Sequence, residues 1–101
     1  MTFGLSKQQL DNIIAFLIRY PEVEKAVIFG SRALGTFKKS SDVDIAIMGN
    51  QVDFSLASRI KFDLEEDTYL PFFFDVVAYQ DLDNEALKQN IDRDGIVIYV
   101  K

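Results

Sequence analysis

The chain has 101 residues, of which 49% are hydrophobic, and its formal net charge is −5. This length fits a single domain over residues 1–101 with one core, and the negative charge argues against general affinity for nucleic acid or for anionic membranes. Cysteine and histidine are both absent, which excludes disulfides and thiolate metal sites, argues against zinc, and removes imidazole as a general base. Any bound metal would take oxygen ligands, as Mg²⁺, Mn²⁺ and Ca²⁺ do. Because the sequence shows neither a signal peptide nor a long apolar run, we expect a cytoplasmic protein without a membrane span.

The first predicted elements are a helix and a strand. Residues 1–5 are expected to be a frayed start, and Ser6 with Gln9 forms a capping-box pattern that marks a helix beginning. Apolar residues then recur at helical spacing as far as Tyr20, where Pro21 ends the pattern. Residues 25–29 are an apolar run rich in β-branched side chains, which predicts a strand. A short helical turn is expected over residues 32–34.

The remaining elements alternate in type. Strands are predicted at residues 43–48 and 72–78, and helices at residues 55–66 and 84–94. Gly95 is placed to stop the last helix, and residues 96–100 form an edge strand or a docked tail. The alternation predicts an α/β fold in which helices flank a mixed β-sheet.

Two aspartates stand out in the predicted second strand. Aspartate is depleted in strands, yet Asp42 and Asp44 flank Val43 in the segment SDVDIAI. Side chains alternate along a strand, so both carboxylates point to one face. A half-solvated strand with its polar residues outward is the alternative interpretation of this pair taken alone.

A third aspartate lies in the predicted third strand. Asp75 follows three phenylalanines and precedes two valines, where a carboxylate is costly unless something pairs with it. It is alternatively a residue at the strand end or the partner of a basic side chain. If the second and third strands are neighbours, Asp42, Asp44 and Asp75 form one cluster whose repulsion a divalent cation relieves. Such a triad can hold two metals about 4 Å apart and position an attack on a phosphate.

A candidate phosphate site lies between these strands. Gly30 and Ser31 follow the first strand, and converging backbone N–H groups at such a turn can hold a phosphate, although an ordinary turn is the alternative. Gly30 and Gly35 have the separation of a P-loop, but threonine stands where that motif requires lysine, so we reject that interpretation. Arg32 could contact a phosphate or be a surface or ion-pairing arginine. Lys38 and Lys39 in the following loop could meet a polyphosphate or be solvated.

Together these segments resemble the DNA polymerase β-like nucleotidyltransferase superfamily, and most closely its small single-domain branch, the minimal nucleotidyltransferases (MNT). The resemblance rests on the segments VIFGSRALG, SDVDIAI and the tail from Asn90 to Tyr99, and it covers nearly the whole chain. It implies the small nucleotidyltransferase fold and transfer of a nucleoside monophosphate from a triphosphate to a hydroxyl. Chemistry of this kind needs positioning and charge neutralisation more than covalent help.

The resemblance also implies roles for individual residues. Asp42, Asp44 and Asp75 are identified with the metal ligands, Asp75 also helping to deprotonate the acceptor hydroxyl. The nucleotide-binding set comprises Gly30, Ser31, Arg32 and Ser41. The implied cofactor is Mg²⁺, or Mn²⁺, with ATP as the substrate.

Two departures from the family pattern bear on the partner. Leu34 stands where many relatives carry arginine, and the chain stops where larger members continue into a helical domain. We therefore expect a partner, in a homo- or hetero-oligomer, to complete the site. In similar pairs the small protein is an antitoxin that binds a HEPN-domain ribonuclease and adenylylates one of its tyrosines. The alternatives are a non-catalytic module that masks a partner, and the nucleotide-binding subunit of a transferase that modifies a small molecule.

Overall fold

The computed structural model describes residues 3–101, which form four strands and five helical segments. The elements in chain order are α1 (Lys7–Leu17), β1 (Lys25–Phe29), α2 (Ser31–Leu34), β2 (Val43–Met48), α3 (Phe54–Asp67), β3 (Phe74–Ala78), the 3₁₀ turn η1 (Tyr79–Asp81), α4 (Glu85–Asp94) and β4 (Ile96–Val100). The predicted alternation of helix and strand is confirmed, and β1 and β2 have the predicted bounds. No described helix is long and apolar enough to cross a membrane.

The strands form one mixed sheet in the order β3-β2-β1-β4. β1 pairs antiparallel with β2 and with β4, whereas β2 pairs parallel with β3. The predicted mixed sheet is therefore confirmed, and the last apolar run is an edge strand rather than a docked tail. The parallel β2–β3 pair is what positions the candidate site, because it brings the two aspartate-bearing strands side by side.

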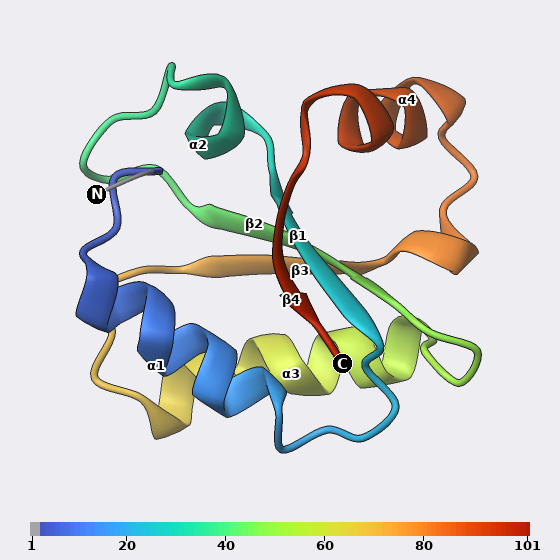
Figure 1. Cartoon of the computed structure of the whole chain (residues 1–101), viewed down its shortest axis with the longest axis horizontal. Helices are drawn as coiled ribbons and strands as arrows, with labels where there is room; N and C mark the ends of the chain where they lie inside the picture. Colours follow the sequence, from blue (N-terminus) through green and yellow to red (C-terminus); the bar gives the residue numbers. More distant parts are fainter. Residues whose placement is uncertain (1–2) are drawn as a thin grey trace.

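Helices cover the two faces of this sheet unequally. In Figure 1, α1 and α3 lie along one face, and α2 and α4 lie on the other. The larger core cluster joins α1 and α3 to alternate strand residues such as Ile28, Ile45 and Phe74. A smaller cluster joins Ile91 of α4 to Val27 and its neighbours on the opposite face. α4 packs against β1 on that face, and Asp42, just before the start of β2, is exposed.

The N-terminal segment is more ordered than the sequence predicts. The capping box is confirmed, since the Ser6 hydroxyl accepts from the N–H of Gln9 at 3.0 Å and the Gln9 side chain accepts from the N–H of Ser6 at 2.9 Å. The expectation of a frayed start was wrong for residues 3–5, because Leu5 is buried in the core; residues 1–2 lie outside the described part. Figure 1 shows this segment beside the loop that joins α2 to β2.

Several predicted element ends differ from the structure. α1 ends at Leu17 rather than near Tyr20, and β3 begins at Phe74 rather than at residue 72. Gly95 does end α4, but with φ −65° and ψ 146°, so it is extended and not left-handed. These differences concern the last turn or first residues of an element, where local sequence signals are weakest.

Candidate active site

The parallel pairing of β2 with β3 brings two of the predicted site residues together. Asp44 and Asp75 are direct partners in the strand register, so their side chains lie on the same face of the sheet. Asp42 lies two residues before Asp44 and immediately before β2, and its charge helps to raise the pKa of Asp44, so the two carboxylates are close. The expected neighbour relation between the second and third strands is confirmed.

The exposure of these side chains corrects one expectation. Asp75 was expected to sit in the middle of a buried strand, but it is the second residue of β3 and is exposed. Among residues 3–101 no ion pair involves it. Asp42 is also exposed, and Asp44 is partly buried. Two of the three carboxylates are therefore accessible to solvent, and the third is partly accessible. The expected cost of burying Asp75 does not arise in the folded chain.

Gly30 fits closely against the central carboxylate. Its backbone has φ 75° and ψ −152°, a region that essentially only glycine adopts. A Cβ at this position would run into the carboxylate of Asp44. Glycine is thus required both by the turn between β1 and α2 and by the approach of Asp44. Ser31 begins α2, whose first N–H groups have no acceptor within the helix and are available to an anion.

The negative charges of Asp75 and Asp42 affect the pKa of Asp44. Partial burial raises the pKa of the Asp44 carboxyl from its usual 3.8 to about 6, with further contributions from Asp75 and Asp42 and a smaller opposing one from Arg32. A raised carboxyl pKa is the expected result of desolvation and neighbouring negative charge. A bound cation would consequently stabilise the ionised carboxylates at this end of the sheet.

The carboxylates do not enclose a metal as their side chains stand. Within residues 3–101 no group of three or more acidic side chains is arranged so that it could hold a metal ion. The oxygen donors nevertheless match the chemistry of Mg²⁺ and Mn²⁺, and the raised pKa of Asp44 marks an excess of negative charge. Asp42 and Asp75 are exposed, so a metal ion in solution can reach both side chains.

Arg32 and Ser41 meet beside this cluster rather than within it. Arg32 is buried, with 2% of its surface exposed, so the interpretation as a surface arginine was wrong. Its Nη2 donates to the carbonyl oxygen of Ser41 at 2.8 Å, and the described part of the chain shows no ion pair for it. The Ser41 hydroxyl accepts from the N–H of Lys38 at 2.8 Å and so closes the loop. Contact of either residue with a nucleotide stays a prediction.

The loop lysines lie at the surface. Lys38 and Lys39 are both exposed, and Lys39 borders a cavity of about 490 Å³ that Phe37 and Phe72 also line. The aspartates do not line this cavity or the other three described cavities. Leu34 is 57% exposed and adds no charge to the site.

Sequence reasoning missed a residue that supports the third aspartate. Glu65 on α3 accepts from the N–H of Phe74 at 2.8 Å and from Nζ of Lys61 at 2.9 Å. It thereby fixes the first residue of β3, directly before Asp75. The i,i+4 spacing of Lys61 and Glu65 signals a helix ion pair, but no local pattern indicates that the same carboxylate reaches a strand.

Comparison with known proteins identifies the family. The model of the family described as "Polymerase beta, Nucleotidyltransferase" matches residues 11–101. A search of curated proteins gave no match.

Solved structures share the fold at low sequence identity. A chain of a toxin–antitoxin complex crystallised with AMP-PNP is 23% identical with a TM-score of 0.76, over 91% of this chain and 73% of that one. A chain from the complex of a tri-AMPylated Shewanella oneidensis HEPN toxin with an MNT antitoxin is 20% identical with a TM-score of 0.69, over 91% and 70%. A nucleotidyltransferase-like protein from Sulfolobus solfataricus is 18% identical with a TM-score of 0.58, over 98% and 85%. With the family model matching nine-tenths of its length, the chain belongs to the polymerase β nucleotidyltransferase family.

Proposed function

We propose that this protein is an Mg²⁺-dependent adenylyltransferase that moves AMP from ATP to a tyrosine hydroxyl of a HEPN-domain toxin and so acts as its antitoxin. The single observation that carries the proposal is the register pairing of Asp44 with Asp75, with Asp42 close to Asp44. Family membership supports nucleotidyl transfer as the reaction class. Adenylyl transfer and the toxin partner are supported by similarity to structures that contain AMP-PNP and a tri-AMPylated HEPN toxin.

The reaction assigns a task to each aspartate. The acceptor oxygen attacks the α-phosphorus, the bond from that phosphorus to the bridging oxygen breaks, and pyrophosphate leaves. Asp75 lies at the edge of the sheet and is exposed, so it can reach the acceptor hydroxyl and take its proton. Together with Asp75, Asp42 and Asp44 would hold a metal, which would supply the neutralisation of the phosphate charge.

The turn at the end of β1 would hold the triphosphate. The N–H groups at Ser31 and the following residue lack acceptors within α2, and Gly30 brings this turn against Asp44. α2 has only four residues, so its dipole adds little and the backbone donors carry this contact. Ser41 and Arg32 stay in the proposed nucleotide-binding set, and their hydrogen bonds also shape the loop beside this turn.

The test is intact-mass spectrometry of the HEPN partner. The partner is incubated with this protein, Mg²⁺ and each nucleoside triphosphate in turn, and one AMP adds about 329 Da per modified tyrosine on the basis of its chemical formula. We expect a gain from ATP that the Asp42→Asn, Asp44→Asn double variant abolishes.

Two other results would redirect the account. A stable complex without any mass gain would favour a binding module that masks the partner. No complex and no gain would favour the small-molecule transferase, and the same reaction should then be screened with hydroxyl-bearing metabolites by following pyrophosphate release.

A further inference from the structure

Arg32 is the one charged side chain that is buried among residues 3–101. Burial lowers the pKa of its guanidinium, against a smaller opposing effect of Asp44 and Asp42. Burying a cation is costly unless its hydrogen-bond donors are satisfied. The groups that accept from this side chain therefore indicate its structural role.

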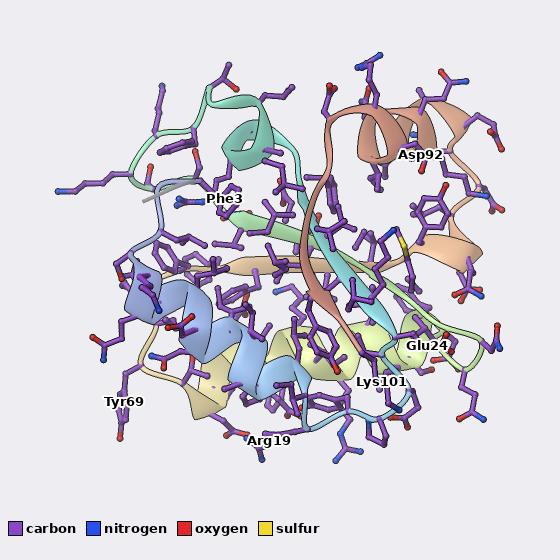
Figure 2. The ribbon with its side chains drawn as sticks, viewed as in Figure 1. Phe3, Arg19, Glu24, Tyr69, Asp92 and Lys101 are labelled. Atoms are coloured by element: carbon purple, nitrogen blue, oxygen red, sulfur yellow. The ribbon has the colours of Figure 1, made fainter. Side chains whose placement is uncertain are left out.

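The guanidinium is bound to backbone carbonyls of two distant segments. Nη2 donates to the oxygen of Ser41 at 2.8 Å, and Nε is shared between the oxygens of Ser41 and Asp42 at 3.3 Å each. Nη1 donates to the oxygen of Phe3 at 2.8 Å. The side chain therefore ties the N-terminal segment, which Figure 2 shows at the labelled Phe3, to the residues that precede β2.

Two aromatic rings enclose the same guanidinium. Its Cζ lies 4.9 Å from the ring centre of Phe72 and 5.3 Å from that of Phe37, within the range of a cation–π contact. Gly4 completes the enclosure, because a Cβ there would run into the Phe37 ring and Nη1 of Arg32. Phe72 lies on the segment that leads into β3, so Arg32 also links the approach to β3 with the start of β2.

These contacts place Arg32 beside the carboxylate cluster, close enough for Asp44 and Asp42 to affect its pKa. It holds the backbone of Asp42, whose side chain is exposed, and it touches the segment three residues before Asp75. Its recorded donors point to carbonyl oxygens and its faces to rings. A phosphate contact would have to displace bonds that fix the loop.

We propose that Arg32 is a positioning residue, which fixes the backbone at Ser41 and Asp42 so that the Asp42 carboxylate can share a metal with Asp44 and Asp75. This inference rests on the proposed metal-dependent function of that site. It assigns the effect of Arg32 to geometry, because a lysine would keep the charge but lacks the planar fork that bonds several carbonyls and stacks between two rings.

The test compares Arg32→Lys with the wild-type protein in three measurements. Mn²⁺ binding is measured by electron paramagnetic resonance without nucleotide, hydrogen exchange is followed in residues 36–43, and AMP transfer is titrated with Mg²⁺ and with ATP. We expect Mn²⁺ binding to weaken by about tenfold or more, as when residues that support metal ligands are changed. Exchange in residues 36–43 should rise, and high Mg²⁺ should restore transfer with the KM for ATP unchanged.

The matched control is Arg59→Lys, since Arg59 is an exposed arginine on α3; it should leave all three measurements unchanged. Should Arg32→Lys not fold, Phe37→Leu keeps the arginine and removes one ring, and it should weaken Mn²⁺ binding in the same direction.

The inference is overturned by any of three results. They are a higher KM for ATP with unchanged Mn²⁺ binding, a lower Tm alone, and a wild-type protein that binds no Mn²⁺. Weakened Mn²⁺ binding in a protein that modifies no acceptor would support the role of Arg32 and refute only the transferase activity.

Discussion

Asp44 and Asp75 face each other across the parallel pair of strands β2 and β3, and each is one residue inside the start of its strand. A single register shift would turn one of them to the core face, where Val43 and Phe74 are buried. The hydrophobic alternation of both strands therefore fixes the relation between the two acids. The raised pKa of Asp44 shows that this arrangement disfavours its ionised form in the protein without metal.

Replacing Asp44 by asparagine should stabilise the metal-free protein at neutral pH. Between pH 3.8 and about 6 the unfolded carboxyl releases its proton while the folded one retains it, so the free energy of unfolding falls as pH rises through this range. Asp44 is partly exposed, and solvent screening reduces the effect to about 1 kcal/mol, or roughly 4–8 °C in Tm. Thermal unfolding in a chelating buffer at pH 7.5 measures it.

The same variant should show almost no gain at pH 3.5, where the Asp44 carboxyl is mostly protonated in both the folded and the unfolded state. Asp83→Asn, at an exposed position in the loop before α4, is the control and should change Tm little at either pH. A variant that is less stable than wild type at pH 7.5 would show that Asp44 makes favourable contacts that this electrostatic account omits. Transfer activity should be lost in Asp44→Asn at both pH values.

Alanine should affect the two positive-φ glycines that flank α2 differently. Gly35 has φ 81° with open space around it, so Gly35→Ala should cost about 1–2 kcal/mol from backbone strain alone. At Gly30 the new Cβ also meets Asp44, and overpacking adds about 1–3 kcal/mol. Urea unfolding gives both values, and transfer assays should show activity lost in Gly30→Ala and kept in Gly35→Ala. Equal losses of stability and activity would argue against close packing of Gly30 on Asp44.

Glu65 should prove to be the anchor of β3. Glu65→Ala removes the acceptor for a partly buried backbone N–H, which should lower the free energy of unfolding by about 1–2 kcal/mol. Glu65→Gln should cost less, because its amide oxygen can still accept. Glu66→Ala, at the exposed neighbouring position, is the control and should be near neutral by urea unfolding at pH 7.

The pH dependence gives a second check on Glu65. The bonds from Lys61 and from the N–H of Phe74 hold the pKa of this carboxyl below its usual 4.5. Its ionised form therefore stabilises the fold above pH 4.5, and this contribution is lost as pH falls through the lower folded value. Wild type and Glu65→Gln should converge in stability toward pH 3, and a constant difference between them would contradict the assignment.

Local sequence patterns predicted the sheet and the aspartates well. The Ser6–Gln9 capping box and the apolar runs of β1 and β2 depend on residues a few positions apart. Such short-range patterns can be read directly from the sequence. The expected shared face of Asp42 and Asp44 rests on strand alternation alone, and the structure places Asp42 just before β2. The expected burial of Asp75 failed because its neighbours Phe74 and Val76 turn to the opposite face of an edge strand.

The surroundings of Arg32 could not be predicted from local patterns. Its partners Phe3, Phe37 and Phe72 are separated by more than thirty positions in the sequence, and only the folded chain brings them together. The neighbouring turn GSR drew attention to the arginine, but as a phosphate contact. Whether a guanidinium faces solvent or carbonyl groups depends on tertiary packing, which neither residue type nor spacing encodes.

The most direct test of the central claim is Mn²⁺ binding, measured by electron paramagnetic resonance, in wild type, Asp44→Asn, Asp75→Asn and the control Asp83→Asn, each with ATP present. If Asp44 and Asp75 share a metal site, both variants should bind Mn²⁺ at least about tenfold more weakly than wild type, and the control should match wild type. Equal binding in wild type and Asp75→Asn would contradict the account, because the register pair would then not act as one site.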